Sequence, residues 1–344
     1  MSDILNGLNP QQKEAVMHTE GPLLILAGAG SGKTRVLTHR IAYLIENGFA
    51  EPEDILALTF TNKAAKEMKE RAASLTGKAA DKMLITTFHS ACVRFLKNRM
   101  MLLGYKRGNF VIYDTDEQKK IIRTIFEETG FQGRYPDIRV YDVISFISKQ
   151  KEKMLGPDEL ESIYPDYPLI TVYKEYERIL KKNNALDFDD LLWKTVQMFE
   201  NYPHILHSYQ EQFKYIMVDE YQDTNLVQFK IISMLADKYQ NLCVVGDDDQ
   251  SIYSFRGADI RNILEFEKEF QNTKVIKLEQ NYRSTRTIVE AANSVIERNS
   301  KRMEKKCFSE GDMGEKIRVL RAYTDREEPK WWSATCATRC GCGR

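Results

Sequence analysis

Near the N-terminus the chain reads Leu23-Leu-Ile-Leu-Ala-Gly-Ala-Gly-Ser-Gly-Lys-Thr34, and this pattern is the strongest indication of the fold. Its first five residues have the length and apolar composition of a buried strand, and a helical pattern follows from Lys33 to about Glu46. The segment between them meets the P-loop pattern G-x-x-x-x-G-K-[ST], except that Ala27 replaces the first glycine. Glycines let backbone N–H groups surround phosphates at the start of a helix, where the helix dipole favours anions. The stretch therefore predicts a phosphate-binding loop between a strand and a helix.

Strands and helices alternate on both sides of a helical interruption. Further strands are expected at 55–60, 83–86, 215–218, 242–245 and 274–278, and further helices at 64–73 and 89–103. Because this alternation is typical of βαβ units, it predicts an α/β fold with a parallel sheet. The region 114–184 is rich in Lys and Glu and has helical periodicity, which indicates an inserted helical subdomain. Asp187 is expected to cap the next helix, so Asp189 and Asp190 are not interpreted as metal ligands.

Composition restricts the class of protein. The 344 residues include 50 Lys and Arg against 50 Asp and Glu, so only a local groove could attract nucleic acid. No apolar run approaches the roughly 18 residues of a membrane span, and the N-terminus does not resemble an export signal. These features predict a cytoplasmic protein with no membrane partner. The six cysteines form no disulfide framework, and Cys336, Cys340 and Cys342 lack a fourth ligand for zinc.

A pair of acidic residues completes a nucleotide site. The apolar run 215–218 ends in Asp219 and Glu220. Lys33 would reach the β- and γ-phosphates, and the Thr34 hydroxyl would bind Mg²⁺. Asp219 would hold the same ion, and Glu220 would orient or deprotonate the attacking water. These residues predict a site for a nucleoside triphosphate with Mg²⁺.

Seven stretches, in order from about residue 8 to about residue 320, match the motifs of one family. They are Leu8-Asn-Pro-Gln-Gln-Lys-Glu-Ala-Val16, the phosphate-binding loop, Thr59-Phe-Thr-Asn-Lys-Ala-Ala65, Thr87-Phe-His-Ser90, Val218-Asp-Glu-Tyr-Gln-Asp-Thr-Asn225, Gly246-Asp-Asp-Asp-Gln-Ser-Ile-Tyr-Ser-Phe-Arg-Gly-Ala-Asp259 and Gln280-Asn-Tyr-Arg-Ser-Thr285. With these motifs the chain resembles the superfamily 1 DNA helicases of the UvrD/PcrA/Rep group. The resemblance implies a RecA-like P-loop NTPase. Its ATP-binding motor domain would be 1–112 and 185–278, with an inserted subdomain at 113–184 and the start of a second motor domain at 279–322.

The resemblance assigns roles to further residues of the nucleotide site. Gln12 matches a glutamine that reads adenine, and Tyr282 matches a tyrosine that stacks on it. Gln250 matches a residue that senses the γ-phosphate and couples it to DNA, and Arg283 matches an arginine that reaches the γ-phosphate from the second motor domain. The implied ATP-binding residues are Gln12, Ala27, Gly28, Ala29, Gly30, Ser31, Gly32, Lys33, Thr34, Arg35 and Tyr282. The implied catalytic residues are Lys33, Asp219, Glu220, Gln250 and Arg283.

The resemblance also implies a track for single-stranded DNA. Its candidate residues are Phe60, Asn62, Lys63, Phe88, His89, Tyr253, Phe255 and Arg256. Bases stack on aromatic rings whatever their sequence, which suits a protein that moves along DNA. Phe60 and Phe88 fit a core position equally well, because their surroundings are apolar. Phe255 stands in a polar loop, at a position where the family usually has tryptophan.

The implied activity is ATP-dependent DNA unwinding with 3′–5′ movement along single-stranded DNA, in repair or replication. The implied partners are single-stranded and 3′-tailed duplex DNA. Two alternatives stay open: an ATP- and DNA-binding fragment without unwinding, and a helicase–nuclease subunit of the AddA/RecB type. Family members are about twice as long, and residues 323–344 do not resemble the family. We therefore expect a truncated or frameshifted chain that binds ATP and single-stranded DNA but does not unwind duplexes.

Overall fold

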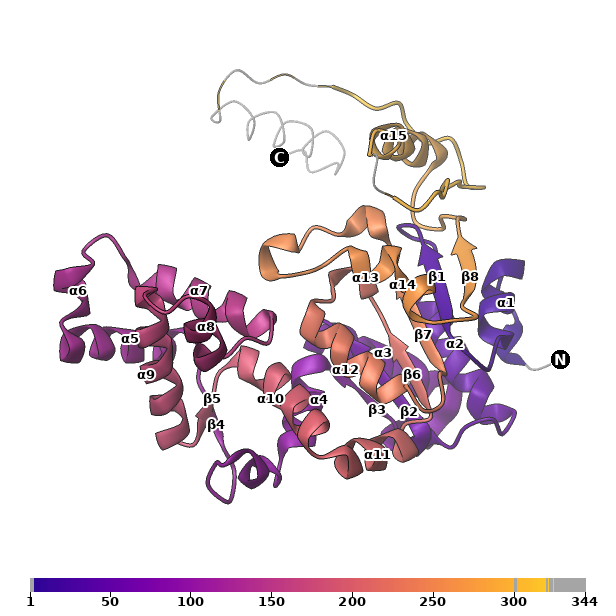
Figure 1. Cartoon of the computed structure of the whole chain (residues 1–344). Helices are drawn as coiled ribbons and strands as arrows, with labels where there is room; N and C mark the ends of the chain where they lie inside the picture. Colours follow the sequence, from indigo (N-terminus) through magenta and orange to yellow (C-terminus); the bar gives the residue numbers. More distant parts are fainter. Residues whose placement is uncertain (1–2, 300–301, 320, 322–323, 325–344) are drawn as a thin grey trace, which may run out of the picture.

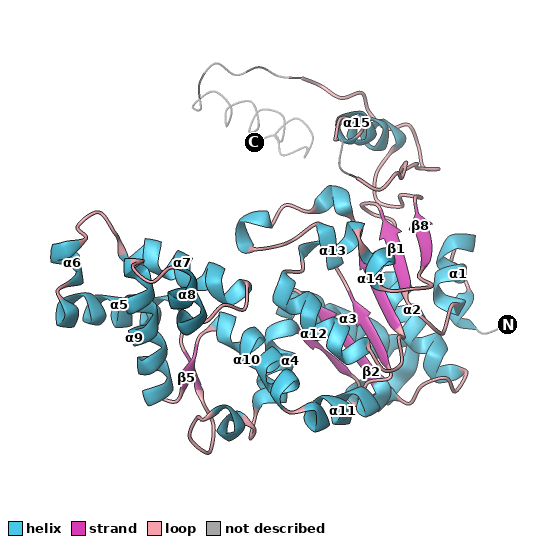
Figure 2. Ribbon diagram, in the orientation of Figure 1, coloured by secondary structure: helices cyan, strands magenta, loops and turns pink. Residues whose placement is uncertain are grey.

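The centre of the molecule is a six-stranded parallel sheet. The structure is a computed structural model that describes residues 3–299, 302–319, 321 and 324. The strand order is β3-β2-β6-β7-β1-β8. Figure 2 shows the strands in magenta with helices in cyan around them. The strands are β1 (Leu23–Ala27), β2 (Ile55–Thr59), β3 (Leu84–Thr87), β6 (Tyr215–Val218), β7 (Leu242–Gly246) and β8 (Lys274–Leu278). Every residue of β1, β2, β6 and β7 is buried, which explains why these strands are nearly continuous apolar runs.

Helices cover both faces of the sheet (Figure 1). Leu23 and Ile25 of β1 pack on one face and Leu24 and Leu26 on the other, because successive side chains of a strand point to opposite sides. The first face is covered by α1 (Pro10–Met17), α2 (Lys33–Glu46) and α3 (Asn62–Thr76). The second is covered by α4 (Phe88–Leu96), α10 (Phe188–Asn201), α11 (Pro203–Gln212), α12 (Leu226–Ala236), α13 (Arg261–Leu264) and α14 (Phe266–Glu269). The predicted α/β fold with a parallel sheet is confirmed.

Several predicted elements have different bounds in the structure: β2 ends at Thr59, β7 ends at Gly246, and the helix expected over 64–73 is the longer α3. The helix expected over 89–103 ends as α4 at Leu96, and the 3₁₀ helix η4 (Met100–Leu103) follows it. Between them Asn98 has a φ of 64°, a left-handed conformation that a continuous helix excludes. The strand expected over 83–86 is β3, one residue later. The other 3₁₀ helices are η1 (Asp3–Leu5), η2 (Pro52–Asp54), η3 (Gly77–Asp81), η5 (Tyr221–Asp223), η6 (Asp248–Gln250) and η7 (Ser254–Arg256).

A helical subdomain with its own apolar core is inserted into the sheet domain and lies beside it (Figure 1). The chain leaves along β4 (Val111–Ile112) and returns along β5 (Ala185–Leu186), and these strands pair in parallel. Between them are α5 (Thr115–Thr129), α6 (Phe131–Arg134), α7 (Val140–Glu152), α8 (Pro157–Ile163) and α9 (Pro168–Lys182). The sequence predicted these helices but not the β4–β5 pair, because two-residue strands are too short to show a periodic pattern.

A buried charge cluster joins this subdomain to α10. The Lys151 ammonium on α7 is fully buried and lies 2.8 Å from carboxylate oxygens of Asp187 and Asp190, and 2.7 Å from one of Glu177. Burial alone would lower the pKa of Lys151, but the three carboxylates outweigh it and raise this pKa well above its ordinary value. Asp187 also caps α10 by accepting a hydrogen bond from the backbone N–H of Asp190 at 2.8 Å. The predicted cap is confirmed, and its carboxylate has a second role in the cluster.

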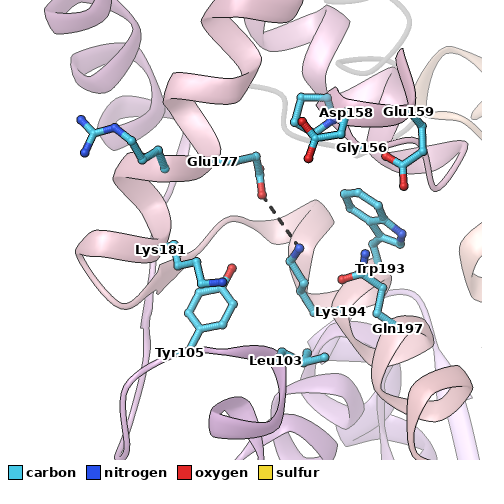
Figure 3. A pocket seen from close by; sticks show the side chains of 12 residues that line it. Leu103, Tyr105, Gly156, Asp158, Glu159, Glu177, Lys181, Trp193, Lys194 and Gln197 are labelled. Atoms are coloured by element: carbon cyan, nitrogen blue, oxygen red, sulfur yellow. Dashed lines mark ion pairs between the residues drawn. The ribbon is translucent and has the colours of Figure 1, made fainter. Parts of the chain in front are cut away.

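A pocket of about 320 Å³ lies where the subdomain meets α10 (Figure 3). Glu177 on α9 and Lys194 on α10 point toward one another there, with 3.9 Å between their charged atoms. The Lys194 ammonium also lies 4.7 Å from the ring centroid of Trp193. The lining residues are Leu103, Tyr105, Gly156, Pro157, Asp158, Glu159, Glu177, Arg178, Lys181, Trp193, Lys194 and Gln197. None of them is a predicted site residue, so the pocket belongs to the junction and not to the candidate site.

No helix in the described part of the chain is both long enough and apolar enough to cross a bilayer. Cys92 and Cys243 are buried free thiols, and Cys307 is a half-buried one. The segment expected to be a tail, 323–344, lies outside the described residues apart from residue 324, and so do Cys336, Cys340 and Cys342.

Replacing Lys151 by methionine tests the charge cluster. The methionine side chain is unbranched like that of lysine and one atom shorter, but Asp187 and Asp190 lose the cation that compensates them in a fully buried position. We expect the free energy of unfolding to fall by about 3–5 kcal/mol, measured by chemical denaturation. Lys149→Met, at an exposed position of the same helix, is the matched control and should leave stability unchanged. Equal stability of the Lys151→Met and unaltered proteins would contradict this account.

Candidate functional site

The phosphate-binding loop has the backbone that an anion site requires. Gly30 and Gly32 have φ values of 69° and 88°, which favour glycine. A Cβ on Gly30 would lie 2.8 Å from Nδ2 of Asn281, and one on Gly32 would lie 3.0 Å from Nε2 of Gln12. Because Gly32 precedes α2 and has no side chain, no side-chain oxygen caps this helix. The first N–H groups of α2 can therefore bind an anion.

The acidic pair reaches this loop from β6. Strand β7 separates β6 from β1, and the carboxyl ends of all three meet at one edge of the sheet. Thr34 Oγ1 donates a hydrogen bond to Asp219 Oδ2 at 3.3 Å, and Lys33 Nζ donates one to Glu220 Oε2 at 2.8 Å. Glu220 has a φ of 52°, a left-handed conformation that is unfavourable for a residue with a Cβ. Strain of this kind concentrates at functional sites.

The pKa values of the two carboxylates are shifted in opposite directions. Asp219 is only 5% exposed, and burial together with the neighbouring charge of Glu220 raises its pKa to about 6. Burial would also raise the pKa of Glu220, but the charge and hydrogen bond of Lys33 outweigh it, so this pKa is lowered. Burial and Glu220 raise the pKa of Asp223 to about 6. A buried carboxylate beside a second negative charge is stabilised by a cation, and Asp219 and the Thr34 hydroxyl offer the oxygen ligands that suit Mg²⁺.

Gln222 links the β6 loop to the β7 loop. Its Nε2 donates to Glu220 Oε2 at 3.0 Å, and its Oε1 accepts from the backbone N–H of Asp247 at 2.9 Å. Asp247 in turn accepts a hydrogen bond from the side-chain amide of Gln250, which lies on η6. Gln222 was not among the predicted site residues. The available signal was an amide next to the acidic pair, since a side-chain amide has separate donor and acceptor atoms that can bond to two loops at once.

The predicted adenine-contacting residues lie at the β1 edge of the site. Gln12 is buried, donates from Nε2 to the carbonyl of Ser31 at 2.9 Å, and accepts from the backbone N–H of Asn9 at 3.1 Å. Its amide is thus already bonded within the chain. Tyr282 is exposed, and its hydroxyl donates to Gln280 Oε1 at 2.8 Å and accepts from Asn9 Nδ2 at 2.9 Å. Asn9, which was not among the predicted site residues, connects Gln12 and Tyr282.

The segment after β8 lies across the phosphate-binding loop. Asn281 Nδ2 donates to the carbonyl of Ala29 at 2.6 Å, and the backbone N–H of Tyr282 donates to that of Gly30 at 2.9 Å. Arg283 follows directly and is exposed, with its Cβ 2.8 Å from a Cβ placed on Gly30. This arrangement brings Arg283 to the loop, whereas the exposed Arg35 points toward Gly7.

The four candidate stacking residues form two different pairs. Tyr253 and Phe255 are exposed, Phe255 by 76%, with ring centroids 5.9 Å apart. Phe60 is half-buried and lies 5.8 Å from Phe88, which is only 2% exposed and packs in the core. A ring buried to that extent has no face for a base. The prediction that Phe88 contacts DNA is therefore corrected: the apolar strand end that suggested a stacking ring is part of the core.

An exposed aromatic residue that the sequence analysis missed lies beside His89. Phe188 is 52% exposed, and its ring centroid is 5.7 Å from that of the half-buried His89 in an edge-to-face arrangement. Burial lowers the pKa of His89. The available signal was an aromatic residue directly after the Asp187 cap.

The remaining predicted DNA-contacting residues lie on two elements. Asn62 and Lys63 are exposed at the start of α3, and Lys63 Nζ lies 4.0 Å from Glu67 Oε1. Arg256 lies on η7, and its side chain is outside the described part of the structure.

Strand order decides how these groups are distributed. The ends of β3 and β2 carry His89 and Phe60, while the ends of β1 and β8 carry the phosphate-binding loop and Arg283. The loops after β6 and β7 lie between the two groups. All of them follow carboxyl ends of strands, where open α/β sheets bind ligands. A parallel sheet with these loops is a RecA-like P-loop nucleoside triphosphatase fold.

The comparison with known families agrees with this class. The model described as the UvrD/REP helicase N-terminal domain matches residues 8–271. The model described as the UvrD-like helicase C-terminal domain matches residues 276–340 and so continues beyond residue 322, where a tail was expected. The chain belongs to the UvrD/Rep helicase family.

Individual relatives are named ATP-dependent DNA helicase PcrA. The chain is 51% identical to the Bacillus subtilis protein over 323 residues, which is 93% of this chain and 43% of that one. It is 49% identical to the Staphylococcus aureus (strain Mu50) protein and 48% identical to a Staphylococcus epidermidis protein, each over 334 residues, or 96% of this chain and 45% of theirs. The chain thus spans less than half the length of these curated relatives.

The raised pKa of Asp219 predicts how stability depends on pH. Because this pKa is about 6 in the folded chain against an ordinary 3.8, the folded state binds the proton more tightly. The Asp219 contribution to stability should therefore fall as pH rises from about 4 to about 6 and then level off. Asp219→Asn removes this penalty, so the variant should gain up to about 3 kcal/mol over the unaltered chain by pH 7 and almost nothing at pH 4.

Urea denaturation between pH 4 and pH 7 measures this difference. Asp237→Asn, at an exposed position after α12, is the control and should differ little from the unaltered chain throughout. A stability gain for Asp219→Asn that does not change with pH would show that Asp219 binds its proton normally.

Proposed function

We propose that this chain binds Mg·ATP and single-stranded DNA and couples ATP hydrolysis to 3′–5′ movement along the strand. The observation that carries the proposal is the pair of contacts from Lys33 and Thr34 to Glu220 and Asp219. They bring a phosphate-binding loop and two carboxylates of different proton affinity to one point. Family membership supports DNA as the polymer, with repair or replication as the setting and the cytoplasm as the location.

The residues divide the work of phosphoryl transfer between them. Lys33 and the N–H groups at the start of α2 bind phosphate oxygens. When Lys33 turns to the γ-phosphate it leaves Glu220, whose carboxylate can then orient water and accept its proton. Thr34 and Asp219 would hold Mg²⁺, which when bound neutralises charge on the phosphate oxygens. Gln250 would sense the γ-phosphate and Arg283 would approach it from the β8 side.

DNA would follow the other half of the sheet edge that is formed by the carboxyl ends of the strands. The exposed rings of Tyr253 and Phe255 can stack on bases of any sequence, and we add Phe188 to the track because it is exposed beside His89. Asn62, Lys63 and His89 would contact phosphates. A local track of this kind is needed because the net charge of the chain is zero.

Lys33→Ala tests the nucleotide half of the proposal. Loss of a charged donor should weaken Mg·ATP binding by about tenfold or more and abolish ATP hydrolysis stimulated by single-stranded DNA. Calorimetry and phosphate release measure the two effects, with the exposed Lys66→Ala as control. Equal ATP affinity in both variants would refute the assignment. Strand displacement from a 3′-tailed duplex by the unaltered chain then distinguishes a helicase from a DNA-stimulated ATPase that does not unwind.

Phe255→Ala tests the DNA half. Loss of an exposed stacking ring should weaken binding of single-stranded DNA by about 1–3 kcal/mol and leave the melting temperature unchanged. The matched control is Phe88→Ala, which removes a core ring and should lower stability by about 3–5 kcal/mol without changing the DNA affinity of the folded fraction. Fluorescence anisotropy and thermal unfolding give both quantities. Unchanged DNA affinity in Phe255→Ala would remove this ring from the track.

A further inference from the structure

The segment from Arg302 to Phe308, which follows α15 (Arg286–Ile296), contacts three loops of the candidate site. The backbone N–H of Phe308 donates to the carbonyl of Glu279 at 2.9 Å, and its carbonyl accepts from the N–H of Asn281 at 2.7 Å. Cys307 Sγ lies against Gly28 of the phosphate-binding loop, so closely that no Cβ would fit there. Lys305 enters the loop after β7. None of the residues from Arg302 to Phe308 was among the site residues predicted from the sequence.

Lys305 is enclosed by three consecutive carboxylates. Its Nζ lies 2.9 Å from Asp247 Oδ1 and 2.7 Å from Asp249 Oδ2, and it also donates to the carboxylate of Asp248. The Lys305 side chain is 2% exposed. Arg302 donates to the same Asp249 Oδ2 at 2.8 Å, and the backbone N–H of Met303 donates to Asp248 Oδ2 at 2.8 Å.

The three aspartates need this cation. One carboxylate oxygen from each lies within 4.8 Å of the others, a spacing at which negative charges repel strongly in buried surroundings. Such a group could hold a metal ion, but here the Lys305 ammonium takes that position. Burial would lower the pKa of Lys305, yet the carboxylates outweigh it and raise this pKa, so the side chain remains charged.

Asp247 transmits the position of Lys305 to the nucleotide site. Its Oδ1 binds Lys305, its Oδ2 accepts the hydrogen bond of the Gln250 amide, and its backbone N–H is held by Gln222. Gln222 in turn binds Glu220, the partner of Lys33. A shift of the Asp247 carboxylate would therefore change the orientation of Gln250.

We propose that Lys305 is a positioning residue that holds Asp247, and through it Gln250, in the orientation required for ATP hydrolysis. The ammonium comes from the segment that follows α15, whereas Gln250 lies on the loop after β7. Lys305 thus makes the hydrolysis step depend on how the start of the second domain sits against the first. The inference rests on the proposed ATPase function.

A double-mutant cycle of Lys305→Met and Gln250→Ala tests this role. We expect each single substitution to lower kcat for DNA-stimulated ATP hydrolysis by about tenfold or more, which is typical of lost positioning partners. The double variant should be no slower than the slower single variant, because Gln250 already lacks its support when Lys305 is absent. Lys306→Met, the exposed neighbour, should keep the kcat of the unaltered chain.

A purely structural role would give different results. Effects on kcat that multiply in the double variant, or an unchanged kcat in Lys305→Met, would overturn the inference. Should Lys305→Met not fold, Lys305→Arg serves instead, because it keeps a cation but moves it. Its melting temperature should stay within a few degrees and its kcat should fall severalfold; an unchanged kcat would contradict the proposal. ATP affinity that does not depend on Lys33, or no hydrolysis by the unaltered chain, would instead refute the proposed function.

Discussion

The ion pair between Lys33 and Glu220 is the contact on which the candidate site depends. It joins two loops 187 residues apart in sequence, after strands that are not neighbours in the sheet. Because Lys33 lowers the pKa of Glu220 while burial raises that of Asp219, two adjacent carboxylates acquire different proton affinities. Asp219 is then stabilised by a cation, and Glu220 becomes a stronger base only when Lys33 moves away from it. Gln222 extends this arrangement to the β7 loop.

Two buried lysines hold separate parts of the chain against the sheet domain. Lys151 comes from the inserted helical subdomain and Lys305 from the segment after α15, and each faces three carboxylates. A buried charge is costly unless it is fully compensated, so such clusters tolerate few other arrangements. They therefore favour one orientation of each segment against the sheet domain.

Local patterns predicted much of the sheet domain. The bounds of β1 and α2 agree with the sequence prediction, because a five-residue apolar run and a glycine-rich turn fix both ends. The Asp187 cap was also predictable, since capping involves residues three apart. Phe88 was not, because an apolar residue at a strand end looks the same whether its ring packs inward or outward. Phe188 was missed for a similar reason: its exposure depends on what packs beside it.

The α/β class, the phosphate-binding loop, the acidic pair and the family resemblance could be read from the sequence, because each rests on short stretches of neighbouring residues. Folding brings particular strand ends next to one another, and this determines which loops form ion pairs. Three contacts depend on this arrangement in space. They are the ion pair of Lys33 with Glu220, the bridge made by Gln222, and the position of Lys305 among Asp247, Asp248 and Asp249. Charges interact through space, and spacing along the chain does not record the distance between residues on different strands.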